Sequence, residues 1–534
     1  MISVSKVAVF TNRVQGLHSL YKRLFDQGIS FLPLDTNLPE ERINQYLNIA
    51  GYSTVLTYLE HQNLLNSYEK VYLDGINFDE IYKSSGNYED IAYTIFTSGS
   101  TGQPKGVEIT REALINFTNG ISEKIDFSPN KRIACFTTVT FDIFFLESIV
   151  ALQKGLTVVL ANEDEQRNPK LMAKLIHDNA VDMIQMTPSR MQLLLNHDKE
   201  LLCLKNVKEI MIGGEPFPFK LLQTLQSKTS AKIYNMYGPT ETTIWSTISD
   251  LTHKNRIDIG RPIKDTEIYI VDDSLSILPN EQTGEICIAG KGLARGYIGR
   301  NDLTAEKFIC LPQKPDIRVY RTGDVGKYLP DGDLVCLGRT DNQIKIRGHR
   351  IELEEIETHL NQIEGIDQSV VIVLQTNETD KFLQAFYTSD NNINSRVIVT
   401  HLTSKLPSYM IPAVFMCVEK FILNSNGKID RNRELECKEI KLDDDVEKAS
   451  DSSAINDIQK RAFNIVVSNL NEKTPNDISL DMDINSIGLD SISFIKIVVD
   501  FEGEFDFEFE DEMLLITKFP TVKSMIEYVE SMVI

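Results

Sequence analysis

Hydrophobic residues recur along the first part of the chain with two alternating periods. From Val4 to about Glu241, short β-branched runs alternate with amphipathic stretches that end at Gly or Asn, as in VSKVAVF followed by VQGLHSLYKRLFDQG. The runs LTVVLA, VDMIQMTP, KEIMIGGEP and KIYNMYG continue this alternation. Strands that alternate with amphipathic helices are typical of a parallel α/β sheet. The pattern therefore predicts that this part of the chain is an α/β domain.

The pattern changes downstream. From Leu251 to Leu337 the helical periodicity fades, and turn-rich runs such as EIYIVDD and GEICIAG predict the strands of a smaller β-rich lobe. A mixed segment follows to about Cys437, and the charged run EIKLDDDVEKASDSS has few large apolar residues, which is typical of a linker. After Ile455, helical periodicity in IQKRAFNIVVSNL, SISFIKIVVDFEG and TVKSMIEYVESMV predicts a small helical bundle. A chain of 534 residues is long enough for several such units.

Composition narrows the class of protein. Hydrophobic residues make up 42% of the chain, and no apolar run approaches the roughly 20 residues that a membrane helix needs. The opening MISVSKVAVF alternates polar with apolar residues, unlike a signal peptide, so we expect a cytoplasmic protein. A net charge of -22 argues against nucleic-acid binding. Seven cysteines without CxxC spacing predict reduced thiols, mostly in the core, and no zinc site.

The segment from Thr97 to Val107, TSGSTGQPKGV, is the first candidate for chemistry and follows the predicted strand AYTIF. Small residues let backbone amides approach a triphosphate, hydroxyl groups add donors, and Lys105 adds positive charge. The segment is not a Walker A loop, because the Lys does not follow GxxxxG and no Ser or Thr comes after it. Taken alone, it also fits a flexible Gly/Ser turn at the surface.

Further motifs follow in order, and together they carry a resemblance. They are NMYGPTETT from Asn235, YRTGD from Tyr320, GRTDNQIKIRGHRIELEEIE from Gly338, LPSYMIP from Leu406 and NGKIDR from Asn426. With TSGSTGQPKGV, they resemble the adenylate-forming superfamily of acyl-CoA synthetases, luciferases and peptide-synthetase adenylation domains. The chain resembles in particular a nonribosomal-peptide-synthetase adenylation domain fused to a peptidyl carrier domain.

The resemblance implies a multidomain α/β fold. Its parts are a large N-terminal α/β portion with a β-rich lobe, a small mobile α+β C-terminal subdomain, and a four-helix-bundle carrier domain. We expect the large portion at residues 1–340, the mobile subdomain at 341–437, the charged linker at 438–454 and the carrier at 455–534. The large portion is short at its start by comparison with the family, because KVAVFTNRVQG aligns with a segment already inside the first lobe.

The resemblance also assigns residues to ATP and Mg²⁺. Asn235 and Tyr237 face the adenine, and Asp324 binds the ribose hydroxyls, although a lone Asp after Gly is otherwise a turn residue. Thr240 lies near the phosphates, and Glu241 helps to hold Mg²⁺, since a carboxylate suits a hard cation. The full nucleotide-binding set comprises Thr97, Ser98, Gly99, Ser100, Thr101, Gly102, Lys105, Asn235, Tyr237, Gly238, Asp324 and Arg339.

Two further positions concern the mobile subdomain. Asp341 matches the family's hinge, and Lys428 in NGKIDR matches the lysine that reaches into the active site. The catalytic residues implied by the resemblance are therefore Lys428, Glu241 and Thr240. Read without the resemblance, Lys428 is a solvent-exposed lysine in a turn.

Asp142, in TVTFDIFFLESIVAL, matches the aspartate that pairs with a substrate α-ammonium group in amino-acid-activating members. A buried carboxylate needs such a partner. A helix N-cap is the alternative role, and both roles are compatible. The family's pocket positions correspond here to Asp142, Ile143, Leu146, Gln185, Met211, Gly213, Met236, Ile244 and Trp245, with Lys428. This set is similar to the glycine pattern, and its bulky members would exclude larger side chains, with alanine as the nearest competitor.

The C-terminal segment DMDINSIGLDSISFIKIVVDFEG resembles a thiolation domain, with Ser491 as the attachment site of covalent 4′-phosphopantetheine. Read without the resemblance, it is a capped amphipathic helix. The resemblance implies a phosphopantetheinyl transferase and a downstream condensation or tailoring enzyme on another chain as partners. A small MbtH-like partner protein is also compatible with it.

The predicted activity is ATP-dependent activation of an amino acid, with glycine favoured, and its transfer to the chain's own carrier. The activity would make the chain an AMP-forming aminoacyl-carrier-protein ligase. Two alternatives stay open. One is an acyl- or aryl-acid ligase that uses CoA or a carrier, which Asp142 and the fused carrier disfavour. The other is a catalytically inactive carrier or assembly module, against which Lys105, Glu241, Asp324 and Lys428 argue.

Overall fold

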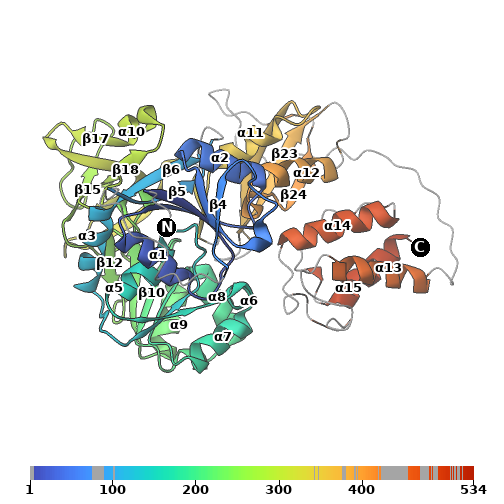
Figure 1. The fold of residues 1–534 in the computed structure, drawn as a ribbon, viewed down its shortest axis with the longest axis horizontal. Helices are drawn as coiled ribbons and strands as arrows, with labels where there is room; N and C mark the ends of the chain where they lie inside the picture. Colours follow the sequence, from blue (N-terminus) through green and yellow to red (C-terminus); the bar gives the residue numbers. More distant parts are fainter. Residues whose placement is uncertain are drawn as a thin grey trace. The chain divides into compact units, whose positions relative to one another are not determined.

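The chain divides into two compact units, Met1–Glu352 and Leu353–Ile534. The computed structural model in Figure 1 describes residues 5–74, 90–99, 103–341, 343–346, 348–375, 381–389, 393, 395–418, 420–421, 455–468, 480, 482, 484, 491–505, 507, 509, 513, 518–519 and 521–533. Lys428 and the charged linker expected at 438–454 lie outside these residues. The domain boundaries inferred from the sequence stay predictions.

A seven-stranded sheet opens the first unit, in the order β16-β6-β5-β2-β1-β3-β4. Its strands are β1 (Lys6–Phe10), β2 (Ser30–Leu34), β3 (Thr54–Thr57), β4 (Glu69–Tyr72), β5 (Ile91–Thr97), β6 (Lys105–Thr110) and β16 (Gly296–Tyr297). The strands from β4 to β5 are parallel, and β6 turns back antiparallel to β5. The central strands are buried along nearly their whole length, as expected where helices cover both faces of a parallel sheet.

A second seven-stranded sheet has the order β13-β12-β11-β10-β9-β7-β8. Its strands are β7 (Arg132–Cys135), β8 (Thr157–Leu160), β9 (Met183–Met186), β10 (Glu209–Gly213), β11 (Lys232–Tyr237), β12 (Thr247–Asp250) and β13 (Arg261–Pro262). The strands from β8 to β11 are parallel, whereas β12 and β13 are antiparallel additions. Each run that the sequence pattern predicted as a strand in this region forms one.

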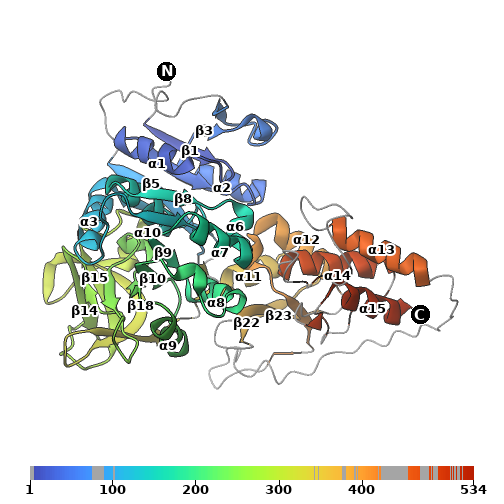
Figure 2. The ribbon, with the colours of Figure 1, turned by 90° about the horizontal axis from the view of Figure 1, so that it is seen from below.

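Helices separate and cover the two sheets (Figure 1, Figure 2). Residues of α1 (Leu17–Asp26), α3 (Arg111–Ser122), α4 (Ile143–Phe145), the π-helical η3 (Leu146–Val150) and α5 (Ala151–Gln153) share one apolar core with the facing sides of both sheets. The outer side of the first sheet packs on α2 (Glu40–Ala50). The outer side of the second packs on α7 (Pro169–Asp178), α8 (Pro188–His197) and α9 (Phe219–Lys228). The short helices of this part are η1 (Leu59–His61), α6 (Glu163–Arg167), η4 (Leu202–Leu204) and η5 (Thr240–Thr242).

The β-rich lobe that the sequence predicted after Leu251 is an antiparallel sheet. Its strands are β14 (Thr266–Val271), β15 (Gly284–Gly290), β17 (Phe308–Leu311), β18 (Lys314–Tyr328) and β19 (Leu334–Arg339), with the short helix α10 (Asn301–Lys307). A two-stranded hairpin, β20 (Ile344–Ile346) and β21 (His349–Ile351), follows it within the first unit.

The second unit holds two groups of elements. A three-stranded sheet of β22 (Gln368–Gln375), β23 (Lys381–Thr388) and β24 (Val414–Cys417) is accompanied by α11 (Leu353–Leu360), α12 (Ser395–Lys405) and η6 (Ser408–Met410). Further along, α13 (Ile455–Ser468), α14 (Ser491–Phe505) and α15 (Val522–Val533) enclose an apolar core of their own (Figure 1). These are the three stretches in which the sequence shows helical periodicity.

Half of the six described cysteines are buried. Cys135, Cys203 and Cys287 are buried, Cys417 is half-buried and Cys310 and Cys336 are exposed, and none of these described cysteines forms a disulfide. Burial raises the pKa of the Cys203 and Cys287 thiols to about 12. Within the described part of the chain, no helix is both long and apolar enough to cross a membrane.

Phe145 is at the centre of the core between the two sheets. Its side chain is fully buried, and its ring lies 4.5 Å from that of Tyr93, 5.3 Å from that of Phe31 and 5.6 Å from that of Tyr21, centroid to centroid. We expect Phe145→Ala to lower the free energy of unfolding by about 3–5 kcal/mol, because it opens a cavity where both sheets and α1 meet.

This loss can be measured by urea denaturation, from the unfolding transition of the first unit. Phe219→Ala is the matched control, because Phe219 is 41% exposed and its loss should cost about 1 kcal/mol or less. Equal losses for the two variants would contradict the central role of Phe145.

Candidate active site

The strands on either side of the loop after β5 are paired. β5 and β6 are antiparallel neighbours as far as Thr97 and Lys105. A Cβ on Gly99 would come within 1.9 Å of the Gln103 carbonyl oxygen, so only glycine fits there. Of the loop residues assigned to nucleotide, Ser100, Thr101 and Gly102 lie outside the described residues.

Lys105 begins β6 and is 6% exposed. Its Nζ lies 3.3 Å from Glu352 Oε1 and 6.0 Å from the centre of the Tyr297 ring. Burial and, secondarily, the charge of Arg350 lower the pKa of Lys105, while Glu352 and Glu241 partly oppose this shift. The ammonium group is thus poorly hydrated, and an anionic ligand at this point would gain from it.

Glu241 is fully buried in η5, directly after β11. Arg350 Nη1 lies 2.9 Å from Oε1 and 3.0 Å from Oε2, and the Tyr297 hydroxyl donates to Oε1 at 2.8 Å. Burial alone would raise the pKa of Glu241, but the charges of Arg350 and Lys105 outweigh it and hold the pKa at about 2. The carboxylate is therefore ionised at neutral pH.

The backbone beside Glu241 is strained. Thr243 and Ile244 have φ values of 64° and 65°, a region that β-branched residues rarely adopt. The cause is the tight reversal from β11 to β12, in which the Ser246 amide donates to the Tyr237 carbonyl at 2.8 Å. Gly238 lies in the same reversal. A Cβ there would lie 2.7 Å from the Ser246 nitrogen, so the close approach of the two backbone segments requires glycine. Strain of this kind is concentrated at functional sites in proteins.

Tyr237, Asp324 and Arg339, all assigned to nucleotide, meet in one cluster. The Tyr237 hydroxyl donates to Asp324 Oδ2 at 2.6 Å, and Arg339 Nη1 donates to Asp324 Oδ1 at 2.6 Å. Asp324 and Arg339 meet because they are register partners on β18 and β19. Arg339 also donates to both oxygens of Asp341, the predicted hinge residue, at 2.7 and 2.8 Å. Asn235 lies apart from this cluster, buried, and donates to the Asp258 carbonyl at 2.8 Å.

Asp142 precedes α4 but does not cap it, because its side chain accepts no capping hydrogen bond. It is 6% exposed, and burial raises its pKa to about 6, although Thr240 and the backbone amides of Ile244 and Ile143 oppose the shift. Its Oδ2 has no hydrogen-bond partner among the described residues. This geometry disfavours the N-cap alternative and leaves a buried acceptor ready for a donor.

The other predicted pocket residues are apolar or also lack partners. Gln185 Oε1 and Trp245 Nε1 have no hydrogen-bond partner in the described part of the chain. A Cβ on Gly213 would lie 2.8 Å from Trp245 Cη2 and 2.9 Å from Met236 Cβ, so these side chains fill the space above Gly213. The pocket residues with 7% exposure or less are Ile143, Leu146, Gln185, Met211, Met236, Ile244 and Trp245.

Leu146 belongs to η3, the π-helical turn. Such turns are rare and are frequent at functional sites. Here the turn carries Glu147, whose carboxylate accepts from Thr137 N at 2.9 Å and from Thr137 Oγ1 at 2.7 Å. The segment that bears Asp142 and Leu146 is thereby fixed to the loop after β7.

Sequence reasoning did not assign Tyr297, Arg350, Glu352 or Glu215 to the site. Tyr297 and Arg350 contact Glu241, Glu352 contacts Lys105, and the Glu215 carboxylate accepts from Ser189 and from the backbone of Gly348. Arg350 and Glu352 stand in the segment read only as a hinge. The closely spaced opposite charges in its RGHRIE run were the signal from which Arg350 and Glu352 could have been assigned to the site.

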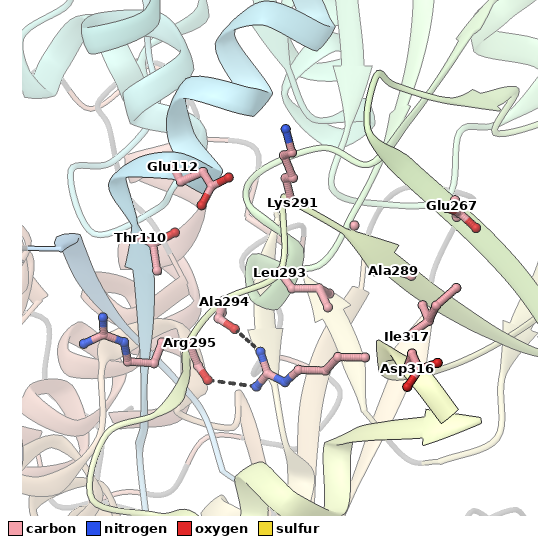
Figure 3. A pocket seen from close by; sticks show the side chains of 12 residues that line it. Thr110, Glu112, Glu267, Ala289, Lys291, Leu293, Ala294, Arg295, Asp316 and Ile317 are labelled. Carbon is pink, nitrogen blue, oxygen red and sulfur yellow. Dashed lines mark hydrogen bonds between the residues drawn. The ribbon is translucent and has the colours of Figure 1, made fainter. Parts of the chain in front are cut away.

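A cavity of about 540 Å³ lies elsewhere in the first unit (Figure 3). Thr110, Glu112, Lys291 and Asp316 are among its lining residues, and it contains no predicted site residue. Arg318, another lining residue, donates to the Ala294 and Arg295 carbonyls, both at 2.8 Å. The Ala294 amide donates to the Glu241 carbonyl at 2.9 Å, so the loop at Ala294 forms a wall between the cavity and the candidate site.

Two predicted residues cannot be located by side chain. Lys428 is outside the described residues. Ser491 is the first residue of α14, although only its backbone is described. The role of Ser491 as the attachment site stays a prediction.

Two families match the chain. Residues 6–298 match the AMP-binding enzymes, and residues 463–529 match the phosphopantetheine attachment site. The first match covers the two large sheets and every described nucleotide residue up to Glu241. The second covers Ser491, all of α14, most of α15 and the end of α13.

Several known proteins are similar to this chain. A dimodular nonribosomal peptide synthase of Bacillus subtilis (strain 168) is 38% identical over 418 residues, which are 76% of this chain and 17% of that protein. The chain therefore spans about a sixth of that relative's length. A four-domain nonribosomal peptide synthetase, solved with AMP and glycine, is 28% identical to this chain and has a TM-score of 0.58. The match covers 99% of this chain and 39% of the synthetase.

A solved protein with adenylation and carrier domains, bound to a vinylsulfonamide inhibitor, has a TM-score of 0.73 and covers 99% of this chain and 88% of its own. At 22% identity, this likeness concerns the fold, and it confirms the predicted adenylate-forming fold with a fused carrier. The chain belongs to the family of AMP-binding enzymes, and it joins a domain of the nonribosomal-peptide-synthetase type to a phosphopantetheine attachment domain.

Proposed function

We propose that the chain uses ATP to activate an amino acid, glycine in preference, and transfers it to the phosphopantetheine thiol of its own carrier. One observation carries the proposal: Asp142 is a buried carboxylate with an unpaired oxygen, and Trp245 and Met236 fill the space above Gly213. A buried acid of this kind calls for a cationic donor, and the two bulky side chains would exclude a large substrate side chain.

Asp142 would bind the α-ammonium group of the substrate. An ion pair with Oδ2 satisfies the unpaired acceptor and lowers the pKa of the carboxyl, so binding and ionisation support each other. The unpaired oxygen of Gln185 and the indole N–H of Trp245 add one acceptor and one donor to the pocket. A small amino acid can use such groups through its ammonium and carboxylate. A carboxylic acid without an ammonium group would leave Asp142 without a partner.

The same site supports attack of the substrate carboxylate on the α-phosphate of ATP. The carboxylate oxygen forms a bond to phosphorus as the bond to the β-phosphate oxygen breaks, which yields the aminoacyl-adenylate and pyrophosphate. Two anions must meet in this step, so the site must supply positive charge. Lys105 supplies it at the end of the phosphate loop, and we assign Lys428 a second contribution from the mobile subdomain. Tyr237 and Asp324 would hold the nucleoside.

Glu241 would hold Mg²⁺. Mg²⁺ binds proteins through one or two carboxylates and completes its shell with phosphates and water, so a single ionised carboxylate beside Lys105 fits. The metal ion would shield charge on the phosphates. Arg350 occupies both Glu241 oxygens in this structure, so it must move first.

Phosphopantetheine would be attached to Ser491. A phosphodiester at the first residue of α14 would lie at the positive end of a helix of 15 residues, a favourable position for an anion. The group supplies the thiol that accepts the aminoacyl unit. A tethered thiol has a high effective concentration at the site, so no tight interface is required. Asp341 is assigned the hinge between the two half-reactions.

Glycine is favoured for reasons of space. Trp245 and Met236 occupy the volume above Gly213, and Leu146 and Ile244 are buried beside them. The similar four-domain synthetase was solved with AMP and glycine, which supports the same choice. Alanine stays the nearest competitor, because one methyl group is worth only about 1–3 kcal/mol of discrimination. A phosphopantetheinyl transferase and a downstream condensation or tailoring enzyme would be the partners.

Pyrophosphate exchange tests the activation step. The full chain should exchange labelled pyrophosphate into ATP with glycine, more weakly with alanine, and not with acetate or benzoate. Lys428→Ala should lower the glycine-dependent rate by about 10²–10³-fold, because a positive charge at the reacting phosphates is lost. Lys420→Ala is the matched lysine control. Exchange that depends on a simple carboxylic acid would favour the acid ligase, and no exchange would favour the inactive module.

The pKa of Asp142 predicts a pH dependence. Below about pH 6 the free carboxyl is protonated and neutral and cannot pair with an ammonium group, which stays charged over this range. At saturating ATP, kcat/KM for glycine should therefore fall about tenfold for each pH unit below 6. Asp142→Asn should lower kcat/KM and flatten the profile. A parent profile that stays level from about pH 5 to 7 would count against the assigned role.

The carrier assignment predicts one modification site. Incubation with CoA and a phosphopantetheinyl transferase should add one phosphopantetheine to the chain, as measured by intact mass, and then one glycyl group with ATP and glycine. Ser491→Ala should lose both additions but keep pyrophosphate exchange, since adenylation does not need the thiol. Ser493→Ala, two residues away on the same helix, is the control and should load normally. Loading of the Ser491 variant would remove this assignment.

A further inference from the structure

The guanidinium group of Arg13 binds the loop that leads from β7 to Asp142. Arg13 lies just after β1 of the first sheet and is half-buried. Its Nη2 donates to the Cys135 carbonyl at 2.6 Å, and its Nη1 donates to the Thr137 carbonyl. Its Nε donates to the Ala161 carbonyl, directly after β8, at 2.8 Å. One side chain from the first sheet therefore binds three carbonyls at or just beyond the ends of two neighbouring strands of the second sheet.

The loop that carries Asp142 is also joined at its two ends. Glu147 is fully buried, and its carboxylate accepts from the Thr137 amide at 2.9 Å and from the Thr137 hydroxyl at 2.7 Å. Asp142 lies midway in sequence between these two residues. Its carbonyl accepts from the Phe145 amide at 2.9 Å. Asp142 therefore stands in the middle of a short loop whose first and last residues are bound to each other.

Arg13 contacts both arms of this loop. The Thr137 carbonyl belongs to the arm before Asp142, and Phe144 belongs to the arm after it. The guanidinium carbon of Arg13 lies 5.7 Å from the centre of the Phe144 ring. A planar guanidinium with five N–H donors can bind several carbonyls and lie over a ring at once, whereas the compact ammonium group of a lysine cannot. The two arms are thus held by one group that no other side chain can replace.

We propose that Arg13 is a positioning residue for Asp142: by holding Thr137 and Phe144, it sets where the Asp142 carboxylate meets the ammonium group of the substrate. The proposal rests on the proposed function for the identity of the substrate. One Asp142 oxygen has no hydrogen-bond partner among the described residues, so its position depends on the backbone that carries it. Arg13 acts through Asp142, and the residues assigned to nucleotide lie on other elements. Its loss should therefore weaken the use of the amino acid and leave the use of ATP unchanged.

Two substitutions of Arg13 test this role. Arg13→Lys keeps the charge and loses the fork of donors, and Arg13→Gln keeps one donor group and loses the charge. In pyrophosphate exchange by the full chain at saturating ATP, each should raise KM for glycine about tenfold, because the carboxylate is displaced from the ammonium group. KM for ATP should stay within about twofold of the parent value. An unchanged KM for glycine in Arg13→Lys would overturn the proposal.

Arg111→Lys is the matched control. Arg111, the first residue of α3, also donates to two backbone carbonyls, those of Phe25 and Ile29, and its guanidinium carbon lies 4.8 Å from the centre of the Phe25 ring. Both lysine variants should lose a similar amount of stability in urea, whereas KM for glycine should rise only in Arg13→Lys. An equal rise in both would mean a general loss of packing and would contradict a positioning role.

A double-mutant cycle tests whether Arg13 acts through Asp142. In the Asp142→Asn background, Arg13→Lys should change kcat/KM for glycine by less than about twofold, because the group that it positions has already lost its charge. If the two substitutions instead lower kcat/KM independently, so that their factors multiply, Arg13 does not act through Asp142.

Hydrogen exchange gives a readout that needs no activity. Arg13→Lys should speed exchange in residues 137–145, which include the bonded amides of Thr137 and Phe145, and Arg111→Lys should not. Faster exchange there, without any glycine-dependent activity in the parent, would support the hold of Arg13 on the loop and reject the proposed function. Unchanged exchange in this segment would overturn the positioning role even if the parent activates glycine.

Discussion

Glu241 has no exposed surface, and an ionised carboxylate in that position can exist only with a positive partner. Much of the first unit is arranged around this requirement. Tyr297 reaches it from the first sheet, Lys105 lies within range of its charge at the phosphate loop, and Arg350 reaches it from the hairpin after the β-rich lobe. The second sheet supplies Glu241 itself at the end of β11. One charge therefore draws together elements that lie far apart in the sequence.

The strained backbone after β11 also provides a hydrogen bond to a buried carboxylate. The reversal after β11 forces Thr243 and Ile244 into a disfavoured region, and the amide of Ile244 then serves Asp142. The backbone that carries Glu241, the proposed Mg²⁺ ligand, thus also supplies a donor to Asp142, the proposed partner of the substrate amine. A change in the reversal would disturb both ends of the proposed reaction, which explains why it is built from small or hydrogen-bonding residues such as Gly238 and Thr240.

Much of this arrangement follows from the sequence, for identifiable reasons. Strands β5 and β11 were predicted from short apolar runs, and the motifs at their ends singled out Lys105, Tyr237 and Glu241, although the two strands belong to different sheets. The partners of those residues were not predictable in this way. Arg350 meets Glu241 across 109 positions and Lys105 meets Glu352 across 247, and no local period encodes such pairings. The lack of a partner for the Asp142 oxygen likewise depends on the tertiary structure, which decides which donors come near it.

Trp245 gives the proposed pocket an optical property. It is the only tryptophan in the chain, it is 2% exposed, and its ring lies against the position of Gly213. The near-ultraviolet tryptophan emission of the whole molecule therefore originates at the floor of the proposed amino-acid pocket. The indole N–H has no hydrogen-bond partner among the described residues, so its emission is sensitive to any polar group that arrives there. The protein thus carries an intrinsic optical probe at the point where its substrate is proposed to bind.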